Sequence, residues 1–208
     1  MMNELNPIFR ARAAELVSVG RFFFERGWVP ATAGNLSARL DDHHMAITVS
    51  GRHKGELTGD DLMVMDLEGN VVSEGEQPSA EAFLHTIMYR RSPRTGAVLH
   101  THSVNATVLS RLSPDGLALE DYEVLKALPG FDTHEAALNV PVFANDQDIR
   151  RLAARVDDLL NREPDTAGYL IEGHGLYTWG TDVQTARRHM EAFEFLFECE
   201  VLTRRLRT

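Results

Sequence analysis

The chain has 208 residues, of which 43% are hydrophobic and 25% charged, an ordinary balance for a globular protein with one substantial core. Its formal net charge of −10 argues against a general nucleic-acid-binding surface, which needs a basic stripe, but allows a small anionic substrate in a local pocket of donors. The single cysteine excludes an intramolecular disulfide, and with no signal-like segment and no apolar run that could span a bilayer we expect a cytoplasmic enzyme without a membrane span.

Apolar periodicity predicts a helix and several strands in the first third of the chain. Apolar residues recur on one helical face over 7–26, and Pro7 suits the first position of such a helix. The β-rich segment 45–49 predicts a strand. Segments 62–66 and 71–72 flank a Glu-Gly-Asn turn that is typical of a hairpin.

Two polar turns in this region are candidates for binding an anion. Gly34 and Asn35 tolerate left-handed backbone, so their turn is either a plain connection or a set of backbone N–H groups for a phosphate. Ser50 and Gly51 form a second small turn, which is followed by the basic or titratable residues 52–54. In an acidic chain this cluster is compatible with anion binding and equally with a solvated charged loop.

Ser79 lies where the N-cap of a helix over 80–91 is expected. A helix N-terminus with a free hydroxyl is well suited to bind an anion. Glu81 falls in the first turn, where the helix dipole stabilises a carboxylate. The same carboxylate could instead face a metal, so the residues alone leave both roles open.

A His-Thr-His sequence follows the short apolar segment 96–99, which predicts a buried strand. Because side chains two apart on a strand point to one face, His100 and His102 are expected to aim at the same point. His174 lies in a Gly-His-Gly turn after another apolar run, and the glycines allow the backbone to bend close to an ion. Together the three histidines predict a metal site.

The second half of the chain alternates short strands and helices. We predict helices over 103–109, 119–126, 145–162 and 182–207, and strands over 139–143, 168–172 and 176–180, with Pro141 at a sheet edge. The sequence has no internal repeat and no linker. We therefore expect a single domain over 1–208, of α/β (α+β) class, with a largely antiparallel sheet between helices.

The motifs occur in an order that resembles the class II aldolase and adducin family over nearly the whole chain. They are Gly34-Asn35-Leu36-Ser37, Ser50-Gly51, Pro78-Ser79-Ala80-Glu81, His100-Thr101-His102 and Gly173-His174-Gly175. The resemblance implies that the substrate phosphate is bound by Gly34, Asn35, Ser50, Gly51 and Ser79. It also implies one Zn²⁺ per subunit on His100, His102 and His174, and a homotetramer with the site near a subunit boundary.

Within the family, the segments 122–126, 140–149 and 175–180 resemble the branch that dehydrates a ketose 1-phosphate in methionine salvage. In that branch a glutamate after the His-Thr-His motif is the acid/base group, and Glu123 occupies its place. We expect burial to raise the pKa of Glu123. Family aldolases use a carboxylate at the position of Glu81 as the base, so the two glutamates compete for the catalytic role.

Two other functions are compatible with parts of this pattern. A sugar-phosphate aldolase or 4-epimerase would share the metal site and the phosphate site. A non-catalytic adducin-type binding module is the other alternative, but such a module is expected to lose metal ligands, whereas all three histidines are present.

Overall fold

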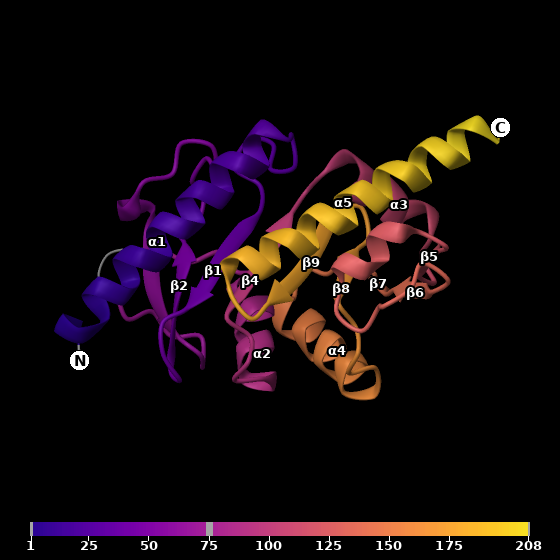
Figure 1. The fold of residues 1–208 in the computed structure, drawn as a ribbon. Coiled ribbons are helices and arrows are strands. Elements are labelled where there is room, and N and C mark those ends of the chain that lie inside the picture. Colours follow the sequence, from indigo (N-terminus) through magenta and orange to yellow (C-terminus); the bar gives the residue numbers. More distant parts are fainter. Residues whose placement is uncertain (1, 74–76, 208) are drawn as a thin grey trace.

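The computed structural model describes residues 2–73 and 77–207 and has a seven-stranded sheet at its centre (Figure 1). The strand order is β3-β2-β1-β4-β9-β8-β7. The strands are β1 (Asn35–Arg39), β2 (His44–Thr48), β3 (Leu62–Asp66), β4 (Ala97–Thr101), β7 (Val142–Phe143), β8 (Gly168–Ile171) and β9 (Gly175–Gly180). Every neighbouring pair is antiparallel except β7 and β8, which confirms the predicted largely antiparallel sheet.

Helices cover both faces of the sheet and make a three-layer α/β fold (Figure 1). Along β4, Ala97 and Leu99 pack with the helices α1 (Met2–Glu25), α3 (Val104–Leu112) and α5 (Val183–Leu206). The residue between them, Val98, packs on the other face with α2 (Ala82–Arg91) and α4 (Ile149–Arg162). The alternation of strand side chains thus divides the core into two clusters.

Both faces of the sheet are anchored by fully buried apolar side chains. On α5 these include Phe193 and Phe197, and on the sheet Tyr169 and Tyr177 stack with their ring planes 7° apart. Burying one large apolar side chain contributes about 1.5–3 kcal/mol, so the two clusters fix the strands that carry the site described below. No helix in the described ranges is long and apolar enough to cross a membrane.

The predicted helix over 119–126 is wrong in its first half. Leu117 and Leu119 are buried while Ala118 and Glu120 are exposed, and this period of two is that of a strand, β5 (Leu117–Glu120). The strand pairs with β6 (Ala137–Val140) in a separate two-stranded sheet. A short 3₁₀ helix, η2 (Glu123–Ala127), follows β5.

Pro141 divides the strand that was predicted over 139–143. Residues before it belong to β6 in the small sheet, and residues after it form β7 beside β8. Proline has no N–H to donate to a ladder, so the chain changes sheets there. The carbonyl of Pro141 still accepts a hydrogen bond from the backbone N–H of Leu170, at 2.8 Å.

Two features near the N-terminus also differ from expectation. Pro7 lies inside α1, which begins at Met2, and is not the first helical residue. The turn after β3 is present, but Val71 makes only an isolated bridge with Met65 and no strand forms there, whereas β2 pairs with β3 over five residue pairs. A second short 3₁₀ helix, η1 (Gly59–Asp61), precedes β3.

Candidate active site

His100 lies on β4, in the middle of the sheet, and its side chain faces the layer of α2 and α4. Its ring is fully buried and stacks on Tyr177 of the adjacent strand β9, with centroids 3.9 Å apart. Its Nδ1 is 2.9 Å from the carbonyl oxygen of Leu176. Because a carbonyl only accepts, Nδ1 carries the proton and the lone pair of Nε2 is free.

His102 and His174 bring two more imidazoles to the same point. His102 follows β4 directly, and its Nε2 is buried without a hydrogen-bond partner among the described residues. His174 lies in the turn between β8 and β9, and its Nε2 is 3.2 Å from Nε2 of His100. A side chain at Gly175 would lie 1.9 Å from the carbonyl oxygen of Thr101, so only glycine lets this turn approach β4 so closely.

Glu81 completes the cluster from the N-terminus of α2. Its Oε1 is 2.9 Å from Nε2 of His174, and its Oε2 is 3.7 Å from Nε2 of His100. The side-chain amide of Asn35, the first residue of β1, donates a hydrogen bond to Oε2. Glu81 and the three histidines each offer one ligand atom, and these atoms all lie within 4.8 Å of one another.

The protonation states suit a cation. Burial lowers the pKa of His102 to about 4 and the pKa of His100 well below its ordinary value, so both rings are neutral. Burial opposes ionisation of Glu81, but its hydrogen bond with His174 holds the pKa of its carboxyl well below the usual range. Neutral imidazole nitrogens with one carboxylate are the donor set of zinc and related divalent ions. The buried, unpartnered Nε2 of His102 fits the same interpretation.

A cavity of about 380 Å³ opens beside this cluster. Its lining includes Glu81, His102 and His174 together with the five predicted phosphate-binding residues, Gly34, Asn35, Ser50, Gly51 and Ser79. These residues come from five separate parts of the chain, and the fold brings them to one space. A larger cavity of about 750 Å³, lined in part by Trp179 and Arg188, has none of them in its wall.

The prediction that Ser79 is the N-cap of α2 is wrong. The helix begins at Ala82 with Glu81 at the N-cap, and Ser79 precedes a turn in which the backbone N–H of Ala82 donates to its carbonyl. The hydroxyl of Ser79 accepts a long hydrogen bond, 3.3 Å, from the backbone N–H of Glu81. The helix was predicted to begin two residues too early because this turn, with its hydrogen bond from Ala82 to Ser79, directly precedes α2.

Gly34 is required by the packing of the chain itself. Its φ of +82° is in the left-handed region, and a side chain there would lie 2.6 Å from the carbonyl oxygen of His100. The predicted turn therefore ends at Gly34. Asn35 is the first residue of β1 and pairs with His100 of β4.

Lys54 belongs to the basic cluster 52–54 that was weighed as an anion-binding segment, whereas the loop after β7 was not predicted as part of the site; residues of both line the cavity. Lys54 is only 1% exposed, and its Nζ donates to the carbonyls of Thr32 (2.7 Å) and Arg52 (2.8 Å). Burial lowers the pKa of its ammonium group to about 8. The sequence signal was the basic cluster 52–54, which does not reveal which of its side chains turns inward.

Glu123 lies apart from the cluster within one chain. Its side chain is 70% exposed on η2, 2.7 Å from the ammonium group of Lys126 and 3.8 Å from His134, and it is not in the wall of the cavity. The hydrogen bond and the charge of Lys126 lower the pKa of Glu123. The expectation that burial raises this pKa is therefore wrong for the chain by itself.

The comparisons with known proteins agree with this geometry. A sequence model of the class II aldolase and adducin N-terminal domain matches residues 14–201. The chain belongs to the class II aldolase and adducin family. A relative in this family, the methylthioribulose-1-phosphate dehydratase of Pseudomonas fluorescens (strain Pf0-1), is 57% identical over 193 residues, covering 92% of this chain and 93% of the relative.

Solved structures of other proteins share the fold. YgbL from Escherichia coli, described as a putative aldolase/epimerase/decarboxylase, superposes with a TM-score of 0.80 and 27% identity, covering 94% of this chain and 90% of YgbL. An L-fuculose 1-phosphate aldolase superposes with a TM-score of 0.79 and 25% identity, covering 94% of this chain and 87% of the aldolase. The resemblance to the family that the motifs predicted is thus confirmed.

Proposed function

We propose that this chain is a methylthioribulose-1-phosphate dehydratase, which converts 5-methylthioribulose 1-phosphate to 2,3-diketo-5-methylthiopentyl 1-phosphate in methionine salvage. The observation that carries the proposal is the 57% identity over 92% of the chain with a relative of that name. The alternative, a sugar-phosphate aldolase or 4-epimerase, has the weaker support of 25% identity with an L-fuculose 1-phosphate aldolase.

His100, His102 and His174 are proposed to hold one divalent metal, with zinc as the first choice because three neutral imidazoles are a common zinc ligand set. When bound, the ion supplies a Lewis acid that polarises the ketose carbonyl at C2 and acidifies the proton at C3. The hydrogen bond from His100 to Leu176 fixes the tautomer that leaves Nε2 free. Glu81 is close enough to join the ligand set or to stand beside it.

The phosphate is proposed to bind at Gly34, Asn35, Ser50, Gly51 and Ser79, which share the wall of the cavity with the histidines. Small residues there let backbone N–H groups approach the phosphate oxygens, and the hydroxyls add donors. The ammonium group of Lys54 adds a positive charge to the same wall.

Two carboxylates are proposed to divide the proton transfers of the dehydration. Glu81 is held ionised and stands among the histidines, so it can accept the proton from C3. Loss of the C4 hydroxyl needs a proton donor, because hydroxide is a poor leaving group, and we assign this step to Glu123. The enol that remains after loss of water tautomerises to the diketone.

Glu123 can take this role only from another subunit, since its side chain is outside the cavity of its own chain. The proposed function therefore requires a homo-oligomer, which resemblance to the family suggests is a tetramer. In this oligomer η2 of one subunit would cover the cavity of the next. Burial at such a boundary would raise the pKa of the Glu123 carboxyl and favour the protonated donor.

A substrate comparison tests the proposed function. The purified protein, loaded with zinc, is offered methylthioribulose 1-phosphate, fuculose 1-phosphate and rhamnulose 1-phosphate in parallel. We expect the first to lose one water, seen by mass spectrometry, and the other two to remain uncleaved. Release of dihydroxyacetone phosphate from either sugar phosphate, with no dehydration of the first, would replace the proposal by an aldolase.

A second experiment tests the phosphate site. In Ser79→Ala, loss of one hydrogen bond to a charged group is expected to raise KM for the phosphorylated ketose about tenfold with a smaller effect on kcat. The dephosphorylated ketose is the control, because its binding should not change between wild type and variant. Equal affinity of the wild type for both ketoses would mean that the phosphate site is misassigned.

A further inference from the structure

The loop between β7 and α4 forms part of the cavity wall and has no role in the proposed metal or phosphate sites. Asn145, Asp146 and Gln147 all line the cavity, and Ile149, the first residue of α4, lines it too. They share this wall with Glu81, His102 and His174, so a ketose bound at the metal would lie in the same cavity as these residues.

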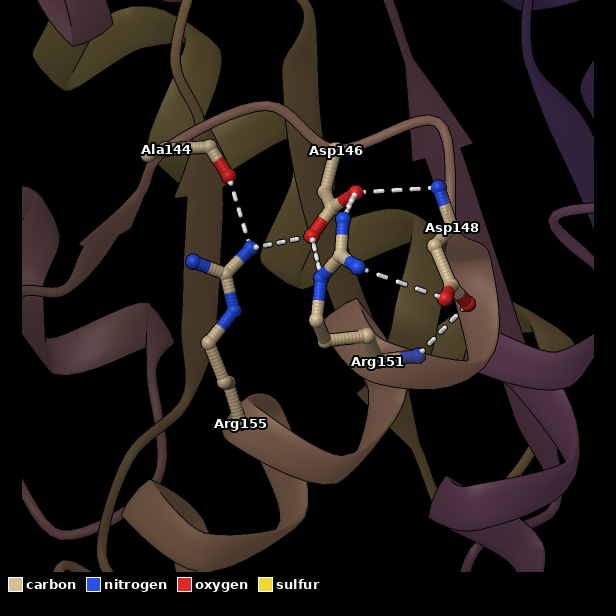
Figure 2. Close-up of polar contacts among 5 residues, drawn as sticks. All are labelled: Ala144, Asp146, Asp148, Arg151 and Arg155. Carbon is tan, nitrogen blue, oxygen red and sulfur yellow. Dashed lines mark hydrogen bonds and ion pairs between the residues drawn. The ribbon is translucent and has the colours of Figure 1, made fainter.

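Asp146 is the centre of a dense set of contacts that hold this loop (Figure 2). Its side chain is only 10% exposed and accepts two hydrogen bonds from Arg151, one from Nε at 2.7 Å and one from Nη2 at 2.6 Å. Nη2 of Arg155 adds a contact at 3.3 Å and also donates to the carbonyl of Ala144, at 3.1 Å. Both arginines come from α4, so the loop is held against the helix that follows it.

The two ends of the loop are also attached to regular structure. The backbone N–H of Asp148 donates to Asp146 at 2.9 Å, and the side chain of Asp148 caps α4 by accepting from the backbone N–H of Arg151 at 3.1 Å. Before the loop, the carbonyl of Phe143 accepts from the backbone N–H of Glu172. The loop is therefore fixed at its start, its middle and its end.

Asn145 and Gln147, on either side of Asp146, have no hydrogen-bond partner for their side chains within the described ranges. Both are exposed residues in the wall of the cavity. A carboxamide donates and accepts at once, which matches the hydroxyl groups of a sugar chain better than a phosphate or a thioether. The contacts of Asp146 and Asp148 thus hold the backbone beside Asn145 and Gln147, while the two side-chain amides remain available to a ligand.

We propose that Asn145 and Gln147 are substrate-binding residues that recognise the hydroxyl groups of the ketose, and that Asp146 with Arg151 and Arg155 is a positioning group that holds the two amides in place. The inference rests on the proposed function for the identity of the substrate. It also explains an acidic side chain in the wall of a cavity for an anionic substrate, since two arginines surround the charge of Asp146.

The first test separates binding from positioning. Gln147→Ala and Asn145→Ala should each raise KM for methylthioribulose 1-phosphate several-fold to about tenfold, the effect of one lost hydrogen bond, with kcat changed much less. Asp146→Asn should raise KM to a similar extent and should also speed backbone amide hydrogen exchange over 144–148, which Gln147→Ala should not. Arg162→Ala, on the same helix but outside the network, is the matched control and should change neither quantity.

Arg151→Lys is the second variant, in case Asp146→Asn folds poorly. It keeps the charge but removes the two-pronged hydrogen bond, so KM and amide exchange should move in the same direction by a smaller amount. In a double-mutant cycle, Asp146→Asn should add little to the KM of the Asn145→Ala/Gln147→Ala variant, because positioning is lost once the positioned amides are gone.

The outcomes distinguish this inference from the proposed function. If the wild type dehydrates the substrate but Asn145→Ala, Gln147→Ala and Asp146→Asn all keep the wild-type KM, the inference is overturned and the function stands. If Asp146→Asn lowers KM, its charge acts only by repelling the anionic substrate, which also overturns the positioning role. If the wild type does not dehydrate the substrate, the proposed function fails and the inference fails with it.

Discussion

Glu81 and Glu123 are two carboxylates in opposite surroundings, and the difference between them bears on how the site works. Glu81 lies between the sheet and α2, within 3.7 Å of two histidines and in hydrogen-bond contact with Asn35. Glu123 lies on an exposed 3₁₀ helix and pairs with Lys126. Both carboxylates are ionised in the single chain, but only Glu81 can act there without a change of surroundings.

This comparison shows that a carboxylate's position along the chain does not determine its chemistry. Glu81 stays ionised because donors compensate the cost of its burial. Glu123 is ionised because solvent and Lys126 surround it. A proton donor needs a different environment, in which the carboxyl group is buried and no donor or positive charge stabilises its ionised form. Glu123 can acquire that environment only by contact with another molecule.

The largest expected effect is on the metal. In His102→Ala, loss of one of three imidazole ligands should weaken zinc binding by more than about 100-fold. Even the loss of a residue that only hydrogen-bonds to a metal ligand weakens metal binding by about 10–100-fold. Metal analysis after dialysis measures the loss. Exposed His43, outside the cluster, provides the control variant His43→Ala. Full zinc content in His102→Ala would exclude the proposed ligand set.

The second prediction sets the two glutamates against each other. Glu123→Gln should lower the rate of dehydration about 100-fold or more, the scale of lost general acid/base catalysis, and leave zinc content and folding intact. Glu81→Gln should disturb zinc content or affinity at least as much as the chemical step. Single-turnover dehydration and metal analysis of both variants measure this. A dead Glu81→Gln with full zinc, beside a Glu123→Gln of normal rate, would exclude Glu123 from the chemistry and favour an aldolase-like site.

A third carboxylate, Glu194 on α5, extends the comparison because it is buried with no cationic partner in the part of the chain that the structure describes. It is 2% exposed and accepts a hydrogen bond from Thr101. Burial raises its pKa from 4.5 to about 7, and the charge of Glu198 adds to the effect. The folded chain therefore holds this proton more tightly than the unfolded chain does.

The sign of this shift predicts how stability depends on pH. The contribution of Glu194 to the free energy of unfolding is fully present below a pH of about 4.5, and it is lost as the pH rises through about 7. Glu194→Gln should match the wild type near pH 5 and be more stable above pH 8, by on the order of 3 kcal/mol. Urea unfolding of both proteins after chelation measures it. A pH-independent difference between the two proteins would contradict the prediction.

The smallest expected effect is at Lys126. Its ion pair with Glu123 is exposed on both sides, so Lys126→Ala should leave the thermal midpoint of a dilute, dissociated chain unchanged within error. Differential scanning fluorimetry at low and high salt measures the midpoint. A clear drop that salt abolishes would show that η2 depends on this pair, and Glu123 would then be less free to enter a neighbouring cavity.

Much of the site could be predicted because its signals are local. The His-Thr-His motif works through the two-residue repeat of a strand, and the Gly-His-Gly turn through the small size of glycine. These patterns brought His100, His102 and His174 together in the prediction, and the structure places them in one cluster. A phosphate-binding role was predicted for five residues through resemblance to the family; these residues line one cavity in the structure, and the role itself stays a prediction.

Other features depend on partners that are distant in sequence. The break at Pro141 was misjudged because the competing small sheet is formed with β5, a segment that was predicted to be helical. Asp146 carries no local sign that Arg151 and Arg155 will surround it, since acidic and basic residues also alternate on solvated helices.

The sequence by itself determined most of the helices and strands, the three histidines and the family, because these follow from side-chain periodicity, from turn residues and from an ordered set of motifs. Only the tertiary structure decided which groups are buried. It placed Glu81 among the histidines, turned Lys54 inward, held the loop of Asp146 against α4 and left Glu123 outside. The reason is physical: burial and charge compensation depend on which segments meet in space, and these set the protonation state of every group that could act.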